Sequence, residues 1–192
     1  MAQDPTNPTL YNNLGNLYME AGRPGELMKL YQDGVNKGIR AAWLYSRLGQ
    51  LYLRQGNKDN AITFFEAAAQ LNASDYDSLQ NLAVAYKQTG RIDDAEAILR
   101  MILKSGEEYA PAYNEMGMIC YQKGDRAAAQ GYFEKAARFD PSYHLNLARL
   151  HKMAGENARA RASFEAFLAA KGSAPEFQDV APQVRQELEA VR

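Results

Sequence analysis

The sequence predicts an all-α fold built from five similar helical hairpins stacked along the chain. The first observation is a set of glycines separated by 34, 34, 34 and 31 residues, namely Gly22, Gly56, Gly90, Gly124 and Gly155. The second is that apolar residues on both sides of each glycine recur at intervals of three and four, the period of an α-helix. Self-similarity of this length is typical of solenoids, in which each unit packs on its neighbours. We therefore expect one solenoid domain over residues 1–192.

The first helix of each hairpin is predicted from the segment that precedes each glycine. When the glycine is placed at position 15 of a 34-residue frame, position 8 holds glycine or alanine in every unit, and tyrosine is frequent at positions 4 and 11. Spacings of three, four and seven put these side chains on one helical stripe, and the small residue lets a neighbouring helix approach closely. Position 7 is always large and apolar: Leu14, Leu48, Leu82, Met116 and Leu147.

The second helix follows each glycine, because a glycine just past a helix end adopts the left-handed conformation without steric penalty. In this segment a small residue and a large one are typically four apart, as in Ala61 and Phe65. Pro24 suits the first turn of the first such helix. Gly34 is expected to weaken that helix by about 1 kcal/mol relative to alanine. Each unit is therefore an antiparallel helical pair.

These columns resemble the tetratricopeptide repeat (TPR) family. The resemblance covers residues 8–41, 42–75, 76–109, 110–140 and 141–174. It implies a right-handed α-solenoid in which the first helices (A helices) line the concave side and the second (B helices) the convex side. The fourth unit is three residues short because Pro141 both closes it and opens the fifth, so we expect a shortened A helix there. Residues 175–191 are expected to form a C-terminal capping helix, which Pro182 can split.

Charge and composition exclude several kinds of partner. The chain has 22 Lys and Arg against 23 Asp and Glu, with no run of like charge, so we expect neither nucleic acid nor a membrane as partner. No apolar run approaches the roughly 20 residues of a membrane-spanning helix. A cytoplasmic location is the default expectation, and other compartments are possible if the chain is a fragment of a longer protein. Asp4-Pro5 favours a fragment, because it matches the Asp-Pro that would close an earlier repeat.

No catalytic, metal or cofactor site is predicted. Cys120, His144 and His151 occupy columns that hold tyrosine in other repeats, which favours packed core residues over a nucleophile or metal ligands. No phosphate-binding loop, nucleophile elbow or HExxH helix is present in the sequence. We expect a protein that is not an enzyme and that needs no cofactor.

The resemblance implies that ligands contact the A-helix positions not committed to packing. Position 6 is asparagine in three of the five repeats, and stacked asparagines can bind a peptide backbone; solvated polar positions are the alternative. Trp43 is either an interface anchor or a core residue packed on the B helix of the first repeat. The candidate peptide-binding residues are Asn13, Asn16, Trp43, Arg47, Gln50, Asn81, Lys87, Asn114, Met118, Tyr121, Asn146 and Arg149.

Together these features predict a non-catalytic scaffold for protein–protein interaction. Its ligand would be a peptide or a segment of another protein, bound in the groove that the A helices line. The alternative is a self-association or regulatory module of a larger bacterial protein or enzyme. The sequence does not identify the partner.

Overall fold

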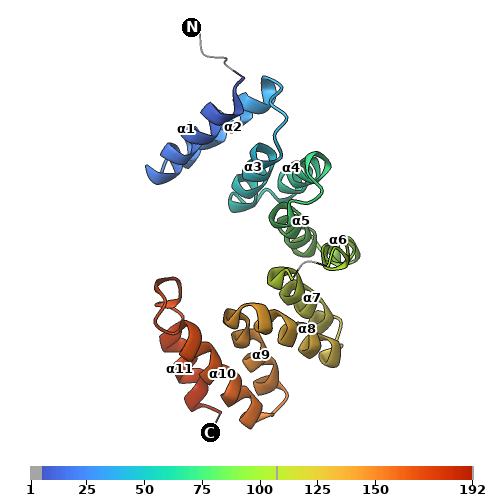
Figure 1. Cartoon of the computed structure of the whole chain (residues 1–192), viewed down its shortest axis with the longest axis vertical. Coiled ribbons are helices and arrows are strands. Elements are labelled where there is room, and N and C mark those ends of the chain that lie inside the picture. The colour runs from blue at the N-terminus through green and yellow to red at the C-terminus, as the bar shows by residue number, and fades with distance from the viewer. Residues whose placement is uncertain (1–5, 107, 192) are drawn as a thin grey trace. The chain divides into compact units, whose positions relative to one another are not determined.

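The computed structural model describes residues 6–106 and 108–191, and there it confirms the all-α prediction (Figure 1). Each predicted repeat contains one helical pair, and Asp4-Pro5 lies outside the described residues. The α-helices are α1 (Pro8–Glu20), α2 (Pro24–Asn36), α3 (Ala42–Arg54), α4 (Lys58–Leu71), α5 (Tyr76–Gln88), α6 (Ile92–Lys104), α7 (Ala110–Gln122), α8 (Arg126–Phe139), α9 (His144–Met153), α10 (Asn157–Lys171) and α11 (Ala181–Glu189). Two short 3-10 helices are η1 (Pro141–Tyr143) and η2 (Pro175–Phe177).

The chain divides into two compact units, Met1–Ile98 (unit 1) and Leu99–Arg192 (unit 2). In unit 1, consecutive helices pack on one another from α1 to α5. In unit 2, the same succession runs from α7 to α11. Each unit therefore buries its apolar stripes between neighbours in sequence, as a repeat fold requires.

The periodic glycines end the A helices as predicted. Their φ angles lie between +63° and +84°, a region that favours glycine. The residue after each one donates its backbone N–H to the carbonyl oxygen five residues earlier, for example Arg23 to Tyr18, at 2.9 Å in all five hairpins. This hydrogen bond satisfies a carbonyl at the helix end and turns the chain into the B helix.

A second column of glycines lets B-helix rings pack on the backbone of A helices. A Cβ atom on Gly49 would lie 2.7 Å from the Phe65 ring, and one on Gly117 would lie 2.6 Å from the Phe133 ring. Both distances are shorter than real Cβ contacts, so a side chain at either position would force the ring to move. We call this contact the ring-on-glycine contact.

Gly34 has a packing role that the sequence did not indicate. It is buried in α2, and a Cβ there would lie 3.1 Å from the Tyr11 ring and 3.2 Å from Leu44. Side chains of α1 and α3 thus meet on α2 at this residue. The glycine has a low helix propensity, but its small size allows both neighbours to approach.

Tyrosines at position 11 join an A helix to the preceding B helix. The Tyr52 hydroxyl accepts a hydrogen bond from Gln32 Nε2 at 2.8 Å, and the Tyr86 hydroxyl donates one to Glu66 Oε1 at 2.6 Å. Burial of the Tyr86 hydroxyl, together with the hydrogen bond to Glu66 and its negative charge, raises the pKa of Tyr86 to about 12. Gln32 and Glu66 both occupy position 25, so the bond recurs from one repeat interface to the next.

The fifth repeat and the cap follow the predicted departures. Pro141 begins the 3-10 helix η1, and α9 has 10 residues where α7 has 13. The expected cap consists of η2 and α11, and Pro182 lies in the first turn of α11. Val184 belongs to one buried cluster with Phe164 and Phe167, so α11 covers α10.

We predict that Gly117→Ala lowers the free energy of unfolding by about 1–3 kcal/mol, because the added methyl group displaces the Phe133 ring. Gly131→Ala in α8 is the matched control, since nothing lies within 4 Å of its added Cβ. The control is expected to gain up to about 1 kcal/mol from helix propensity. Urea unfolding of both variants measures the difference, and equal stability would contradict the ring-on-glycine contact.

We also predict that Tyr86→Phe lowers the free energy of unfolding by about 1–2 kcal/mol near neutral pH, because the hydrogen bond to Glu66 is lost. The folded pKa lies above the ordinary value of 10.0, so this contribution is complete below pH 10 and disappears as the pH rises towards about 12. Urea unfolding of wild type and variant at several alkaline pH values tests this. A difference in unfolding free energy between wild type and variant that stays constant up to about pH 12 would show that the hydroxyl proton of Tyr86 does not stabilise the fold.

Candidate functional site

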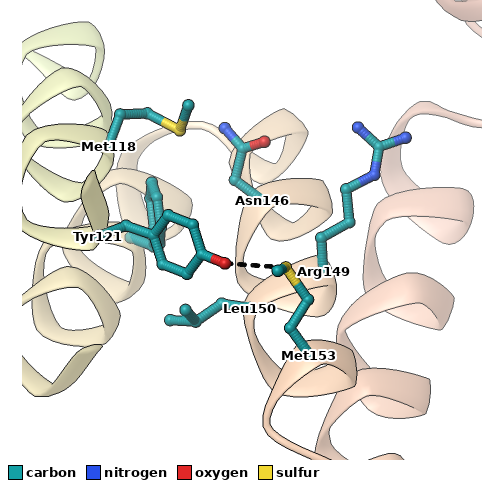
Figure 2. A pocket seen from close by; sticks show the side chains of 7 residues that line it. Met118, Tyr121, Asn146, Arg149, Leu150 and Met153 are labelled. Carbon is teal, nitrogen blue, oxygen red and sulfur yellow. Dashed lines mark hydrogen bonds between the residues drawn. The ribbon is translucent and has the colours of Figure 1, made fainter. Parts of the chain in front are cut away.

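A pocket of about 230 Å³ lies in unit 2 among α7, α8 and α9 (Figure 2). We call it the α7–α9 pocket. Two of its residues belong to α7, one to α8 and four to α9. They are Met118, Tyr121, Phe133, Asn146, Arg149, Leu150 and Met153. Four of the sequence-predicted ligand residues, Met118, Tyr121, Asn146 and Arg149, are thereby brought together.

The pocket has a buried apolar floor and an exposed methionine rim. Phe133 and Leu150 are 3% and 6% exposed, whereas Met118 and Met153 are 40% and 63% exposed. The Tyr121 hydroxyl donates a hydrogen bond to Met153 Sδ at 3.1 Å, which joins α7 to α9 (Figure 2). Flexible thioether side chains of this kind adapt readily to different apolar ligands.

Two asparagines add a polar edge to this apolar hollow. Asn146 Nδ2 on α9 donates a hydrogen bond to Asn114 Oδ1 on α7 at 2.6 Å. An amide side chain has both a donor and an acceptor, so this bond does not engage Asn146 Oδ1 or Asn114 Nδ2. Asn114 was a predicted ligand residue, and the bond places it next to the pocket although it does not line it.

Arg149 forms an ion pair with the capping helix. Its Nη2 and Nε atoms lie 2.9 Å and 3.3 Å from Glu187 Oε1 on α11. Lys152 Nζ lies 3.7 Å from the other carboxylate oxygen. Figure 2 shows the guanidinium directed away from Tyr121. The aliphatic part of Arg149 therefore contributes to the pocket wall, while its charge is paired with α11.

Unit 1 has an equivalent but much smaller hollow of about 20 Å³. Its lining residues are Met19, Leu27, Tyr31, Arg47, Gln50, Leu51 and Arg54. In the repeat frame, Arg47, Gln50 and Arg54 stand where Asn146, Arg149 and Met153 stand in unit 2. The repeat thus creates the same hollow twice, and the side chains decide its volume and polarity. Of these two hollows, the α7–α9 pocket is the one with room for a ligand side chain.

The other predicted ligand residues line neither hollow. Trp43 is half-buried and packs edge-on against Tyr31 of α2, with ring centroids 5.9 Å apart, as in the core alternative. Four further residues lie on the A helices of unit 1: Asn13 and Asn16 on α1, and Asn81 and Lys87 on α5. The sequence did not single out Phe133, Leu150 and Met153, although Met153 occupies position 13 of its repeat, outside the packing positions 4, 7, 8 and 11.

The histidines and the cysteine lie in helix interfaces. His151 is 5% exposed, and its Nδ1 atom lies 2.7 Å from Glu156 Oε2. This hydrogen bond and the neighbouring Arg159 lower the pKa of Glu156, while burial lowers the pKa of His144. Cys120 packs partly buried against the cluster that contains Phe133 and Leu150. In residues 6–106 and 108–191 no group of three or more His, Cys, Asp and Glu side chains is arranged to hold a metal ion.

Paired helices that turn at left-handed glycines and pack rings on small residues define a helical-repeat protein. Models of the tetratricopeptide repeat match residues 52–116, 110–143 and 141–166. The chain therefore belongs to the tetratricopeptide repeat family. Members of this family are generally protein-interaction modules.

Three human proteins are similar in sequence to most of the chain. Tetratricopeptide repeat protein 7B is 26% identical over 145 residues, 73% of this chain and 17% of that protein. Superkiller complex protein 3 is 26% identical over 153 residues, 74% of this chain and 10% of that protein. Protein O-mannosyl-transferase TMTC1 is 25% identical over 159 residues, 79% of this chain and 18% of that protein. The chain thus spans less than a fifth of the length of these relatives.

Solved structures support the fold alone. A thermophilic tetratricopeptide repeat protein from Thermus thermophilus has a TM-score of 0.73 at 16% identity, covering 95% of this chain and 97% of that one. PilF from Pseudomonas aeruginosa has a TM-score of 0.74 at 18% identity, covering 95% and 90%. Among the described residues, none of the helices is long and apolar enough to cross a bilayer.

We predict that Glu187→Gln lowers the free energy of unfolding by about 0.5–1 kcal/mol, because it removes a partly buried ion pair with Arg149. Glu189→Gln, an exposed residue of the same helix, is the control and is expected to change little. Thermal unfolding at low and high salt measures both, since salt weakens such pairs. Identical behaviour of the two variants would contradict a stabilising role for the contact between α9 and α11.

Proposed function

We propose that this protein is a non-catalytic scaffold that binds a segment of another polypeptide, with one apolar side chain of that segment in the α7–α9 pocket. The observation that supports this most strongly is the exposure of Met118 and Met153 above a buried apolar floor. Exposed apolar groups of this size gathered at one hollow are a common mark of an interaction site.

The size and lining of the pocket suit a side chain better than a cofactor. Its volume of about 230 Å³ is below the range of roughly 300–1,000 Å³ that is usual for small-molecule sites. Burying a leucine, methionine or phenylalanine side chain contributes about 1.5–3 kcal/mol. That energy corresponds to roughly a 10- to 100-fold gain in affinity.

The asparagine pair supplies contacts for the backbone beside that anchor. Asn146 Oδ1 can accept a hydrogen bond from a peptide N–H, and Asn114 Nδ2 can donate one to a peptide carbonyl. Asn13 and Asn81, on the A helices of unit 1, are proposed to bind a peptide backbone through the same two groups. The positive charge of Arg149, a residue that lines the pocket, is paired with the carboxylate of Glu187. We therefore expect the ligand side chain in the pocket to be apolar rather than acidic.

A regulatory module within a larger protein is the second candidate function. The observation in its favour is that the matched relatives are five to ten times longer than the part that resembles this chain. In such a protein the bound segment would belong to the same polypeptide or to a second copy. The chemistry of the pocket would be unchanged.

Selection of peptides from a random displayed library on the intact chain tests the proposal. We expect the selected peptides to share one apolar residue, and binding measured by fluorescence polarisation to weaken about 10-fold or more in Met153→Lys and Asn146→Ala. Met153 is 63% exposed, so Met153→Lys is expected to fold, with only a small loss of stability from the hydrogen bond to Tyr121.

Met101→Lys is the matched control, because Met101 is 46% exposed and does not line the pocket. It is expected to bind the selected peptides like wild type. Peptides without a common apolar anchor, or equal loss of affinity in the control, would overturn the proposal.

A further inference from the structure

The small hollow of unit 1 has two positive charges and no matching carboxylate. Arg47, Gln50 and Arg54 line it from α3 at intervals of three and four residues, so they share one face of that helix. Both arginines are exposed. Within residues 6–106 and 108–191, no carboxylate forms an ion pair with either guanidinium, and none lines the hollow. We call this site the α3 arginine hollow.

The charges are unmatched although the helices around α3 are all described. The helices α1 and α2 contribute Met19, Leu27 and Tyr31 to the lining, and α2, α4 and α5 contact α3. Glu20 follows Met19 in α1, and it forms an ion pair with neither arginine. The packing of unit 1 therefore supplies an apolar floor to this hollow but no counter-charge.

Unit 2 shows how the same helix face receives a carboxylate. Arg149 of α9 occupies position 9, where α3 has Gln50. Its Nη2 and Nε atoms lie 2.9 Å and 3.3 Å from Glu187 Oε1, and Lys152 Nζ lies 3.7 Å from Oε2. Glu187 belongs to α11, the helix after the α9–α10 pair. The helix after the α3–α4 pair is α5, and it pairs no carboxylate with the arginines of α3.

The volume of the α3 arginine hollow suits one oxygen atom. About 20 Å³ is too small for an amino-acid side chain, but it exceeds the roughly 10–15 Å³ that a water-sized group needs. A carboxylate can place one oxygen there and keep the other outside, beside the exposed guanidinium groups. Guanidinium groups bind carboxylates through paired N–H···O hydrogen bonds, and Gln50 Nε2 adds a neutral N–H donor.

The floor of the hollow also favours a negative charge. The Tyr31 side chain is 0% exposed, and its hydroxyl has no hydrogen-bond partner among the described residues. Burial raises the pKa of Tyr31, while the positive charge of Arg47 acts in the opposite direction. The guanidinium of Arg47 is therefore close enough to act on this hydroxyl. With no competing acceptor, the O–H dipole is free to stabilise an anion at the hollow.

The charge of the whole chain favours a protein carboxylate over a nucleic acid. Lys and Arg number 22 against 23 Asp and Glu, so the positive potential at Arg47 and Arg54 is local. Nucleic acids are held by many basic residues, each facing a phosphate group, rather than by one pair of arginines. A single acidic side chain matches a positive site of this size.

We propose that the α3 arginine hollow binds an aspartate or glutamate side chain of a partner polypeptide, with its carboxylate held by Arg47, Gln50 and Arg54. The site shares no residue with the α7–α9 pocket, so it adds a second kind of recognition to the proposed function. Because both arginines are exposed, salt weakens the contact, and the affinity for one carboxylate is low.

NMR of the arginine side chains tests the site directly. The probe is N-acetyl-glutamate N-methylamide, titrated into the intact chain at low salt up to about 20 mM. We expect saturating shifts of the Nε–H resonances of Arg47 and Arg54, and none with the glutamine analogue. Arg40, an exposed arginine of unit 1 that does not line the hollow, is the internal control. Equal shifts at Arg40, or no shifts at Arg47 and Arg54, would overturn the proposal.

Charge-removing variants test which arginines bind the probe. Arg47→Gln/Arg54→Gln is expected to weaken glutamate binding at least about tenfold, measured at the side-chain amide resonance of Gln50. Arg40→Gln/Arg138→Gln removes two exposed charges elsewhere and is expected to bind glutamate like wild type. Circular dichroism checks that both variants stay helical. Equal weakening in both variants, or none in the first, would contradict the assignment.

Inorganic phosphate is the second probe, because a phosphoryl group also pairs with arginine. Larger saturating shifts at Arg47 and Arg54 with phosphate than with blocked glutamate would overturn the choice of a carboxylate.

Two further measurements separate this inference from the proposed function. Met153→Lys is expected to bind blocked glutamate like wild type. Arg47→Gln/Arg54→Gln is expected to bind selected peptides that lack acidic residues with unchanged affinity, since it keeps every residue of the α7–α9 pocket. Loss of glutamate binding in Met153→Lys would contradict a separate site in unit 1. The two proposals can therefore fail independently.

Discussion

The ring-on-glycine contact holds α3 close to α4 and α7 close to α8. Phe65 lies on Gly49 and Phe133 on Gly117, at distances that leave no space for a Cβ atom. The close approach lets a short pair of helices bury a large aromatic surface. This burial is needed because an isolated helix of 13 residues is marginally stable in water. It also fixes how α3 is rotated on α4 and how α7 is rotated on α8, and hence which side chains of α3 and α7 remain outside the core.

The packing of the repeat determines where the hollow forms, and a few side chains determine its volume and polarity. Both units have a hollow at the same repeat positions, yet the one in unit 1 is lined by two arginines and has almost no free volume, whereas the one in unit 2 is open. Arg54 in unit 1 occupies the repeat position that Met153 occupies in unit 2, and Arg47 occupies the position of Asn146. These two differences account for much of the contrast between the hollows. A repeat fold can therefore change its ligand without changing its core.

The hairpins could be predicted from the sequence, because spacing alone determines which residues share a helical face. The spacing of the glycines predicted where the A helices end, and Pro141 predicted that α9 is short. The pocket floor could not be predicted in the same way, since its depth depends on how side chains from three helices fit together. The ion pair of Arg149 with Glu187 was also missed, because α11 lies outside the repeat frame. Trp43 shows the limit of composition, since the sequence left open whether it is an interface anchor or a core residue, and its contact with Tyr31 depends on how α2 and α3 pack.

Methyl NMR of the methionine side chains during titration with a selected peptide tests whether the ligand enters the α7–α9 pocket. We predict that the largest shifts occur at Met118 and Met153, while Met19 and Met28 of unit 1 stay unchanged at the first equivalents. Shifts confined to Met19 and Met28, or binding without any change at Met118 and Met153, would contradict it.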